Sequence, residues 1–366
     1  MGLVRAALDG LTPYEPGKPE EELQRELGLD RVVKLASNEG PWGPFAAALE
    51  ALERCAPTLN RYPDGGAFHL RNALAERHGV DRANVITAAG ADAVIGHLSV
   101  ATLDPGDEIV TGWPSFVSYV LDAVKLGAVP RQVPLAADHY DLDGLLAAIG
   151  PRTKLVYIAT PNNPTGTMTT RAQLDAYFER VPEHVLTVLD QAYFEYIEHA
   201  DYPDGIEEYA KVGRRVLVLR TFSKIFGLAG LRVGYGVGPG DVIEAIGKTR
   251  RPFDVSTQAQ VAALASLDAP DELAVRRRLT HEGRAALELT LRDHGLAPAG
   301  PSVANFLFAE VGEDARPLFE ALLRQGAIVR PLAAFGAPGA LRITVGTPDE
   351  NAFFAEALAS VLAAAS

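Results

Sequence analysis

The chain has 366 residues, 48% of them hydrophobic and 22% charged, which is the composition of an ordinary folded protein with a large core. It carries 47 acidic residues against 34 lysines and arginines, so its formal net charge is −13 at pH 7. This acidity disfavours nucleic acid and anionic membranes as partners, because both require a basic surface. It does not exclude a small anionic ligand in a local basic pocket.

The cysteine count, the lengths of the apolar runs and the histidine spacing limit the expected location of the protein and its expected kinds of site. One cysteine, Cys55, excludes a disulfide within the chain and makes the reducing cytoplasm the simplest location. The N-terminus lacks the long apolar core of a signal peptide, and no apolar run approaches the roughly 20 residues of a membrane helix. The eight histidines form no HxxxH or HxH pair, so we expect no histidine-rich metal site.

In chain order, the first 30 residues indicate an arm that ends in a short charged helix. From about residue 80 onward, short β runs alternate with helical stretches. Several of these runs are apolar at nearly every position, which is typical of a mostly parallel sheet covered by helices on both faces. Ligands bind such sheets at the carboxyl ends of the strands. The expected strands are NVITAAG, DEIVTG, VPRQVPL, TKLVYIAT, VLTVLD, RRVLVLRTFS and RVGYGVG.

Near residue 256 the pattern changes. The segment DELAVRRRLTHEGRAALELTLRDHG predicts a long helix, and we expect its arginines Arg276–Arg278 to form a solvated face. The strand-like runs NFLFAEV, AIVRPL and ALRITVG follow, with a helix around 314–325 and another at the C-terminus. The sequence thus predicts an arm at 1–30, a large domain at 31–255 and a small α+β domain at 256–366.

Unusual residues stand at the strand ends. The run VITAAGAD leads into a helix that begins near Ala91, where backbone N–H groups can bind a phosphate. Asn163 lies in PNNPTG, Asp190 ends TVLD, and LRTFSK places Lys224 at a strand end with Arg232 after it. Each has an ordinary explanation: a proline-fixed turn, a helix N-cap, a surface lysine or a plain ion pair. These separate explanations do not account for the occurrence of all four residues at strand ends of one sheet.

One chemistry requires this set. A lysine amine forms a Schiff base with an aldehyde cofactor. Pyridoxal phosphate also needs a carboxylate at its ring nitrogen, so that the protonated ring can accept electrons from the substrate. It needs donors at its phenolic oxygen and an anion site for its phosphate, to which Arg232 and Ser223 can contribute. The glycines of GYGVGPG have the wrong spacing for a dinucleotide loop.

Motifs along the whole chain then resemble those of one family. They are LTPYEPG, KLASNEGPWGP, RYPDGG, PNNPTG, DQAY, TFSKIFGLAGLRVGYG, VRPL and LRITVGTPDEN. With them the chain resembles the histidinol-phosphate aminotransferases, which are fold-type I pyridoxal-phosphate enzymes. The resemblance implies an α/β fold, with a large domain built on a mostly parallel seven-stranded sheet flanked by helices and a smaller α+β C-terminal domain. It also implies pyridoxal 5′-phosphate as cofactor and a homodimer.

The resemblance implies a role for each matching position. Lys224 holds the cofactor and is the catalytic base and acid, and Asp190 pairs with the ring nitrogen. Asn163 and Tyr193 donate to the phenolic oxygen, and Phe116 stacks on the ring. The phosphate is bound by backbone N–H groups of Ala91 and Asp92, by Ser223 and Arg232, and by Tyr62 from the neighbouring subunit.

The substrate side depends on arginines. Arg330 and Arg342 lie on strand-like runs of the small domain and can accept phosphate or carboxylate through paired hydrogen bonds. The resemblance adds Tyr14 and Asn38 to this set. It implies transamination of histidinol phosphate with 2-oxoglutarate, which yields imidazole acetol phosphate and glutamate in histidine biosynthesis. An aromatic amino-acid aminotransferase is the first alternative, and a decarboxylase of an amino-acid phosphate is the second.

Three positions depart from the family pattern. Gln191 stands where the family often has glutamate, Phe116 where tyrosine is common, and Gly40 where asparagine is usual. These changes affect the substrate assignment more than the cofactor assignment. Within the lysine motif, we expect Gly227 and Gly230 to let the chain turn so that Arg232 returns to the phosphate.

Overall fold

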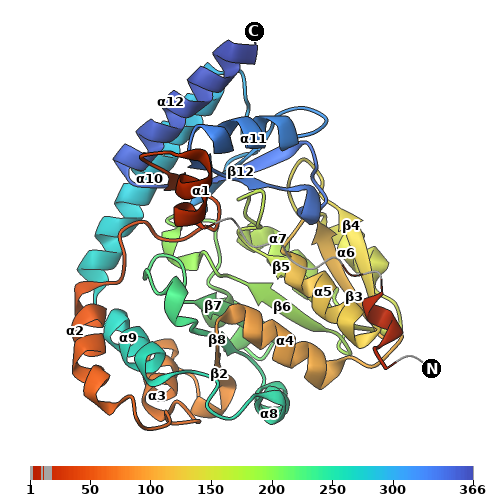
Figure 1. Cartoon of the computed structure of the whole chain (residues 1–366). Coiled ribbons are helices and arrows are strands. Elements are labelled where there is room, and N and C mark those ends of the chain that lie inside the picture. Colours follow the sequence, from red (N-terminus) through yellow and green to blue (C-terminus); the bar gives the residue numbers. More distant parts are fainter. Residues whose placement is uncertain (1–2, 10, 12–18, 366) are drawn as a thin grey trace.

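The computed structural model describes residues 3–9, 11 and 19–365. A seven-stranded sheet with the order β2-β8-β7-β6-β5-β3-β4 forms the centre of the larger part of the molecule (Figure 1). Strand β8 is antiparallel to both of its neighbours, β2 and β7, and the remaining neighbouring strands of this sheet are parallel. The expected α/β fold with a mostly parallel sheet is therefore confirmed. The strands are β2 (Val85–Ala88), β3 (Glu108–Trp113), β4 (Val129–Pro134), β5 (Thr153–Ala159), β6 (Leu186–Asp190), β7 (Val216–Thr221) and β8 (Gly234–Val237).

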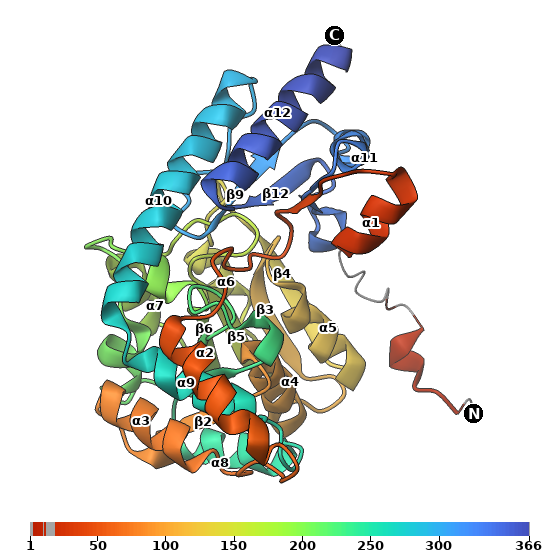
Figure 2. The same cartoon turned by 60° about the vertical axis from the view of Figure 1, so that its left-hand side comes forward.

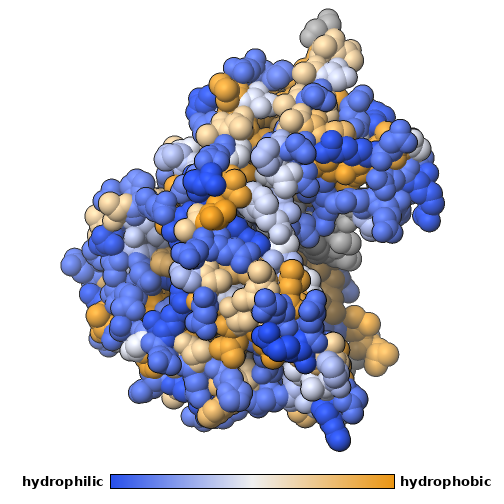
Figure 3. Space-filling view, turned by 90° about the vertical axis from the view of Figure 1, so that its left-hand side faces the viewer, coloured by the Kyte–Doolittle hydropathy of each residue, from blue (hydrophilic) through white to orange (hydrophobic). Residues whose placement is uncertain are grey.

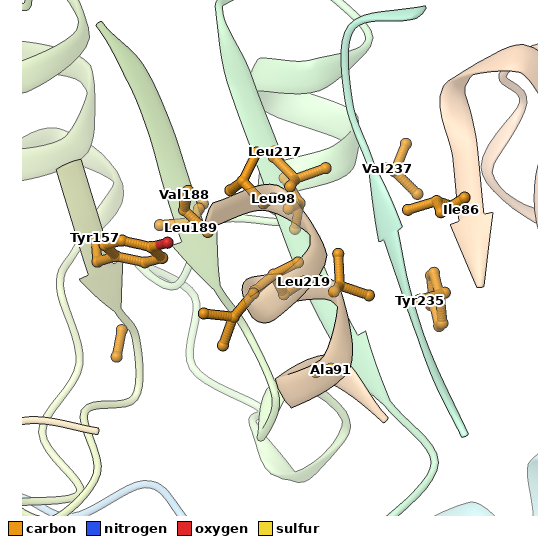
Figure 4. Close-up of a cluster of buried hydrophobic side chains, with 14 of the residues drawn as sticks. Ile86, Ala91, Leu98, Tyr157, Val188, Leu189, Leu217, Leu219, Tyr235 and Val237 are labelled. Atoms are coloured by element: carbon orange, nitrogen blue, oxygen red, sulfur yellow. The ribbon is translucent and has the colours of Figure 1, made fainter. Parts of the chain in front are cut away.

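The central strands are apolar on both faces because helices cover both faces. Every residue of β6 and β7 is buried. Helix α4 (Ala91–Thr102) crosses one face, where its Leu98 belongs to the same buried cluster as Leu217 and Leu219 of β7 (Figure 4). Further helices of this part are α5 (Val117–Leu126), α6 (Leu142–Ala148), α7 (Arg171–Phe178) and α8 (Gly240–Thr249).

Local signals mark several helix ends. Helix α7 begins at a capping box, in which the Thr170 side chain accepts from the Gln173 N–H and the Gln173 side chain accepts from the Thr170 N–H. Helix α5 ends at Gly127 in the left-handed conformation. Helices α2 (Ala46–Cys55), α3 (Phe68–His78) and α9 (Thr257–Leu267) pack together beside the sheet (Figure 2).

The C-terminal part is built on a second, antiparallel sheet with the order β11-β12-β9. Its strands are β9 (Phe306–Glu310), β11 (Arg330–Pro331) and β12 (Ala340–Thr344). The short strand β1 (Val33–Lys34) pairs in parallel with β10 (Ala327–Ile328), and helix α1 (Glu20–Leu27) precedes it. Helices α10 (Pro270–Asp293), α11 (Arg316–Arg324) and α12 (Pro348–Ala365) complete this part. The division at 1–30, 31–255 and 256–366 stays a proposal, and both β1 and α9 make contacts across its boundaries.

Helix α10 runs along the molecule from the large sheet part to the small one (Figures 1 and 2). Its Arg276 is only 5% exposed, so the expected solvated arginine face is wrong at this position. The N-terminal half of α10 lies against the segment around Gly43 and Pro44, and the guanidinium therefore meets backbone carbonyl groups instead of water. Arg278 does face solvent, where it forms an ion pair with Glu282.

The surface is mainly hydrophilic on the side shown in Figure 3, with hydrophobic residues scattered over it. In the part of the chain that the structure describes, no helix has the length and apolar character that a membrane crossing requires.

Candidate active site

A cavity of about 180 Å³ opens at the carboxyl ends of β5, β6 and β7, below strand β12 of the C-terminal part. Most of the site residues predicted from the sequence line this cavity. They are Asn38, Ala91, Asp92, Phe116, Asn163, Asp190, Tyr193, Ser223, Lys224, Arg232 and Arg342.

Three predicted residues do not line the cavity or cannot be placed. Arg330 is buried beside the site, directly opposite Arg342 in the β11–β12 ladder. Tyr62 is 82% exposed and stacks on Phe253, with ring centroids 4.6 Å apart. Tyr14 lies outside the described residues.

Lys224 follows the end of β7, and its amine lies in the cavity wall. Its Nζ donates to Ser37 O at 3.3 Å and lies 5.7 Å from the centre of the Tyr193 ring. Burial lowers the pKa of the Lys224 amine from 10.5 to about 8, and the nearby Arg342 cation adds to this effect. A lysine with such a pKa is partly neutral near physiological pH, as a nucleophile or general base must be.

The backbone of the turn that carries Lys224 packs closely against the backbone of residues 40–43. Gly227 has φ +69, and a Cβ there would overlap Gly43 O, so the expectation that this glycine shapes the turn is confirmed. A Cβ on Gly40 would lie 2.8 Å from Lys224 O, so an asparagine at this position would require one of the two backbones to shift. Gly230 has no positive φ and no atom within 4 Å of a Cβ position, so the same expectation is wrong for Gly230. Arg232 itself takes the left-handed conformation, with φ +55.

Asp190 ends β6 and is 7% exposed. Its Oδ2 accepts a hydrogen bond from Tyr119 Oη at 2.6 Å, and its Oδ1 accepts from the Ala192 N–H at 3.0 Å. Burial raises the pKa of the Asp190 carboxyl, whereas these two hydrogen bonds lower it. A buried carboxylate held in this way can pair with a cationic ring nitrogen.

Tyr119 is the clearest site residue that the sequence did not reveal. Burial raises the pKa of its hydroxyl well above 10, so the group remains a hydrogen-bond donor at all ordinary pH values. Its ring meets Phe116 edge to face, with centroids 5.6 Å apart. The signal is the spacing of three between these aromatics, which places Phe116 at the N-cap of α5 and Tyr119 in its first turn. That spacing is too common in helices to identify a site by itself.

An anion site lies at the N-terminus of α4. Ala91 and Asp92 form the first turn of this helix, where the backbone N–H groups point out of the helix end. The Arg232 guanidinium lies beside them, with Nη2 2.8 Å from the position that a Cβ on Gly90 would take. Arg232 Nη1 donates to Ser223 Oγ at 3.4 Å. A helix N-terminus, a guanidinium and a hydroxyl group therefore meet at one point, as a phosphate requires.

Neutral hydrogen-bonding groups also line the cavity. Asn38 Nδ2 donates to Tyr193 Oη at 2.9 Å, and burial raises the pKa of Tyr193 to about 12. The Tyr193 hydroxyl therefore stays neutral and can donate in turn. Arg342 Nη1 donates to Asn163 Oδ1 at 2.5 Å.

The Arg342 guanidinium is fixed from several sides. Nη2 donates to Ala36 O at 2.6 Å, and Arg330 Nε donates to the same carbonyl oxygen at 3.4 Å. The rings of Phe306 and Phe335 lie 5.4 and 5.8 Å from the Arg342 guanidinium carbon. A fixed cation at the cavity wall can bind a phosphate or carboxylate group.

These groups fit pyridoxal phosphate chemically. The cavity combines a nucleophilic amine, a buried carboxylate, an anion site and neutral donors, and each matches one functional group of that cofactor. Among the described residues, no group of three or more His, Cys, Asp or Glu side chains could hold a metal ion.

The fold and the site together define the class of protein. The family model of aminotransferase class I and II matches residues 30–358, and the chain belongs to this family.

Individual relatives show which members of the family this chain resembles. A histidinol-phosphate aminotransferase of Carboxydothermus hydrogenoformans is 44% identical over 98% of this chain and 99% of the relative. One from Pseudomonas fluorescens is 45% identical over 100% of this chain and 99% of the relative. The crystal structure of histidinol-phosphate aminotransferase from Sinorhizobium meliloti in complex with pyridoxal 5′-phosphate superposes with a TM-score of 0.91, at 30% identity, and covers 100% of this chain and 99% of that chain. The resemblance stated from the motifs is thereby confirmed.

Proposed function

We propose that this protein is a pyridoxal-phosphate-dependent transaminase that converts histidinol phosphate and 2-oxoglutarate to imidazole acetol phosphate and glutamate, a step of histidine biosynthesis. One observation carries the proposal: Lys224, Asp190 and the anion site at the start of α4 face a single cavity. The names of the relatives support the choice of substrate.

The residues of the cavity would hold the cofactor at defined positions. Lys224 would bind its aldehyde carbon, Asp190 its ring nitrogen, and Asn163 and Tyr193 its phenolic oxygen. Phe116 would pack against the ring. The phosphate would be held by the N–H groups of Ala91 and Asp92 and by the side chains of Ser223 and Arg232. When bound, pyridoxal phosphate supplies an electron sink that stabilises negative charge on the substrate carbon.

The chain itself supplies the proton transfer. The Lys224 amine would act as the general base that removes a proton from the substrate Cα, and then as the general acid that returns it. A pKa of about 8 suits a group that must act as base and then as acid. Hydrogen bonds from Tyr119 Oη and the Ala192 N–H favour the carboxylate form of Asp190, which would stabilise a positive charge on the ring nitrogen.

The two substrates share an anionic group at one end but differ in its chemistry. Arg342 is the described cation best placed to accept either the phosphate of histidinol phosphate or a carboxylate of 2-oxoglutarate, because its guanidinium lines the cavity. Arg330 adds positive charge next to it, and Asn38 lies on the same side. Tyr14, outside the described residues, remains part of the proposed substrate site.

A homodimer is part of the same proposal. Tyr62 and Phe253 form a stacked pair of aromatic rings that is largely exposed on the single chain, at 82% and 45%. Exposed stacked aromatics are typical of an interface, and we propose that Tyr62 reaches the cofactor phosphate of the neighbouring subunit. A cytoplasmic location remains a prediction.

Substrate choice decides between this function and its alternatives. The cofactor-loaded protein is mixed separately with histidinol phosphate, phenylalanine and threonine phosphate, and the loss of its visible absorbance is followed with product analysis. We expect histidinol phosphate to convert the cofactor most efficiently. Faster conversion by phenylalanine would make the protein an aromatic amino-acid aminotransferase, and carbon dioxide release from threonine phosphate would make it a decarboxylase.

The cofactor linkage has its own test, which does not depend on activity. Borohydride reduction of the loaded protein followed by peptide mass analysis should place the cofactor on Lys224. The Lys224→Ala variant should still bind the cofactor through Asp190 and the phosphate site but lose transamination. Substantial turnover by this variant would exclude the assigned role of Lys224.

A further inference from the structure

Helix α10 directs a row of hydrogen-bond donors at the backbone of the segments that build the cavity. Arg277 Nε donates to Glu195 O at 2.7 Å, and His281 Nε2 lies 2.7 Å from Tyr196 O. Arg284 Nη1 donates to Ala304 O at 2.8 Å. Glu195 and Tyr196 follow Tyr193 in the chain, and Ala304 precedes strand β9. The helix thus acts on the site through backbone carbonyl groups, and Arg276 makes the most such contacts.

Arg276 joins two segments that are far apart in the sequence. Its Nη1 donates to Gly43 O and, at 3.4 Å, to Ile225 O, whereas its Nη2 donates to Pro44 O at 3.2 Å. The same nitrogen donates to Glu272 at 3.0 Å, and the guanidinium lies 4.4 Å from the centre of the Phe45 ring. The side chain is 6% exposed, so these contacts replace nearly all of its hydration.

Both joined segments determine where the Lys224 amine lies. Ile225 is the next residue in the lysine turn, and Gly43 O is the atom on which Gly227 of that turn packs. At its other end, the segment that contains Gly43 provides Ser37 O, which accepts the hydrogen bond from Lys224 Nζ. The distance between the two backbones therefore sets the position of Nζ relative to its acceptor.

We propose that Arg276 is a positioning residue for Lys224: by binding carbonyl groups of residues 43, 44 and 225, it holds the lysine turn at a fixed distance from the segment that faces it. The inference rests on the proposed function, in which Lys224 is the catalytic base. Arg276 touches neither the cofactor site nor the cavity, and it acts through the backbone alone.

The loss of this guanidinium would leave buried carbonyl groups without their donor. Water would then enter between the two segments to solvate them, since an unsatisfied buried acceptor is costly. A displacement of about 1 Å in a catalytic group can cost roughly 100-fold in rate. Entry of water would also weaken the burial that lowers the pKa of the lysine.

The test compares Arg276→Gln and Arg276→Lys with Arg278→Gln. Arg278 is a matched control because it lies on the same helix, pairs with Glu282 and keeps its side chain 60% exposed. In each cofactor-loaded protein, borohydride reduction first locates the cofactor. The pH midpoint of the visible band, the single-turnover rate with histidinol phosphate, the apparent substrate affinity and the melting temperature are then measured.

For Arg276→Gln we expect the single-turnover rate to fall on the order of tenfold or more, with little change in apparent substrate affinity. The pH midpoint should move upward, because readmitted water favours the charged form of the linked nitrogen. Arg276→Lys keeps the positive charge but offers a flexible point donor in place of the planar guanidinium, so its effects should be smaller and in the same direction. Arg278→Gln should match the unmodified protein.

Arg276 would have no positioning role if Arg276→Gln lowered only the melting temperature and kept the rate and midpoint of Arg278→Gln. If Arg276→Gln does not fold, Arg276→Lys decides: an unchanged rate and midpoint would overturn the inference. Failure of the unmodified protein to hold the cofactor on Lys224 would instead overturn the proposed function, and the inference with it. The reduction experiment separates these outcomes.

Discussion

The hydroxyl group of Tyr119 donates a hydrogen bond of 2.6 Å to Asp190 Oδ2, and both side chains are buried in the cavity wall. The hydrogen bond from Tyr119 and the burial of Asp190 have opposite effects on the pKa of its carboxyl group. Burial favours the protonated acid, whereas the hydrogen bond stabilises the carboxylate. A protonated Asp190 could not sustain a positive charge on a ring nitrogen beside it.

Tyr119→Phe should therefore weaken the site without altering its shape. The variant removes one hydrogen bond to a charged group, worth about 1.5–3 kcal/mol, so we expect the transamination rate to fall roughly tenfold or more. The protonation of the cofactor ring nitrogen, followed by nitrogen NMR of a labelled cofactor, should decrease.

Tyr157→Phe is the control for this prediction. Tyr157 is equally buried and stacks on Tyr119 with ring centroids 4.4 Å apart, but it makes no hydrogen bond to Asp190 among the interactions of the described residues. Equal effects of the two substitutions would show that packing, and not the bond to Asp190, accounts for the loss.

Gly227 and Gly230 should differ sharply when each is replaced by alanine, although both lie in the lysine motif. In Gly227→Ala, the left-handed backbone and the overlap with Gly43 O should lower the free energy of unfolding by more than about 1 kcal/mol and reduce cofactor affinity. Gly230→Ala should be neutral or slightly stabilising, because its Cβ enters open space. Thermal unfolding and cofactor titration of both variants provide the measurement, and a well-tolerated Gly227→Ala would contradict this account of the turn.

The contrast between Gly227 and Gly230 shows which features of the fold and the site can be predicted from the sequence. The sheet could be predicted because its buried strands are continuous apolar runs, and Asp190 and Lys224 stood out because each is polar at the end of such a run. The position of Gly227 against Gly43 could not be predicted, since it depends on contact between segments about 180 residues apart. Nor could the sequence distinguish Gly230, which follows the same local pattern without any steric need.

Arg276 and Tyr119 illustrate the same limit in opposite ways. Arg276 belongs to a run of three arginines on a long helix, and exposure is the ordinary state of arginine. Its burial follows from the path of α10 over the lysine turn, which no local pattern encodes. Tyr119 has the local signature of a core aromatic, and its second role became visible only when Asp190 was placed next to it.

The pH dependence of cofactor attachment should follow Lys224. Its amine attacks the aldehyde only when neutral, and burial lowers its pKa to about 8 from 10.5. The attachment rate of the cofactor-free protein should therefore rise with pH through about 8 and level off above it. Stopped-flow absorbance at a series of pH values checks this, and a rate that continued to rise until pH 10 would show that the amine is not perturbed.

Arg342→Gln should weaken both half-reactions, because one guanidinium at the cavity wall would bind the phosphate of histidinol phosphate and a carboxylate of 2-oxoglutarate in turn. Charged hydrogen bonds are worth about 1.5–3 kcal/mol, so the loss of catalytic efficiency should be roughly tenfold or more with each substrate. Arg330→Gln is the comparison, since Arg330 adjoins Arg342 without lining the cavity and should cost less. Rapid-mixing kinetics of each half-reaction separates the cases. If Arg342→Gln impairs only one half-reaction, the two substrates place their anionic groups at different cations, and a larger loss from Arg330→Gln would identify Arg330 as the main one.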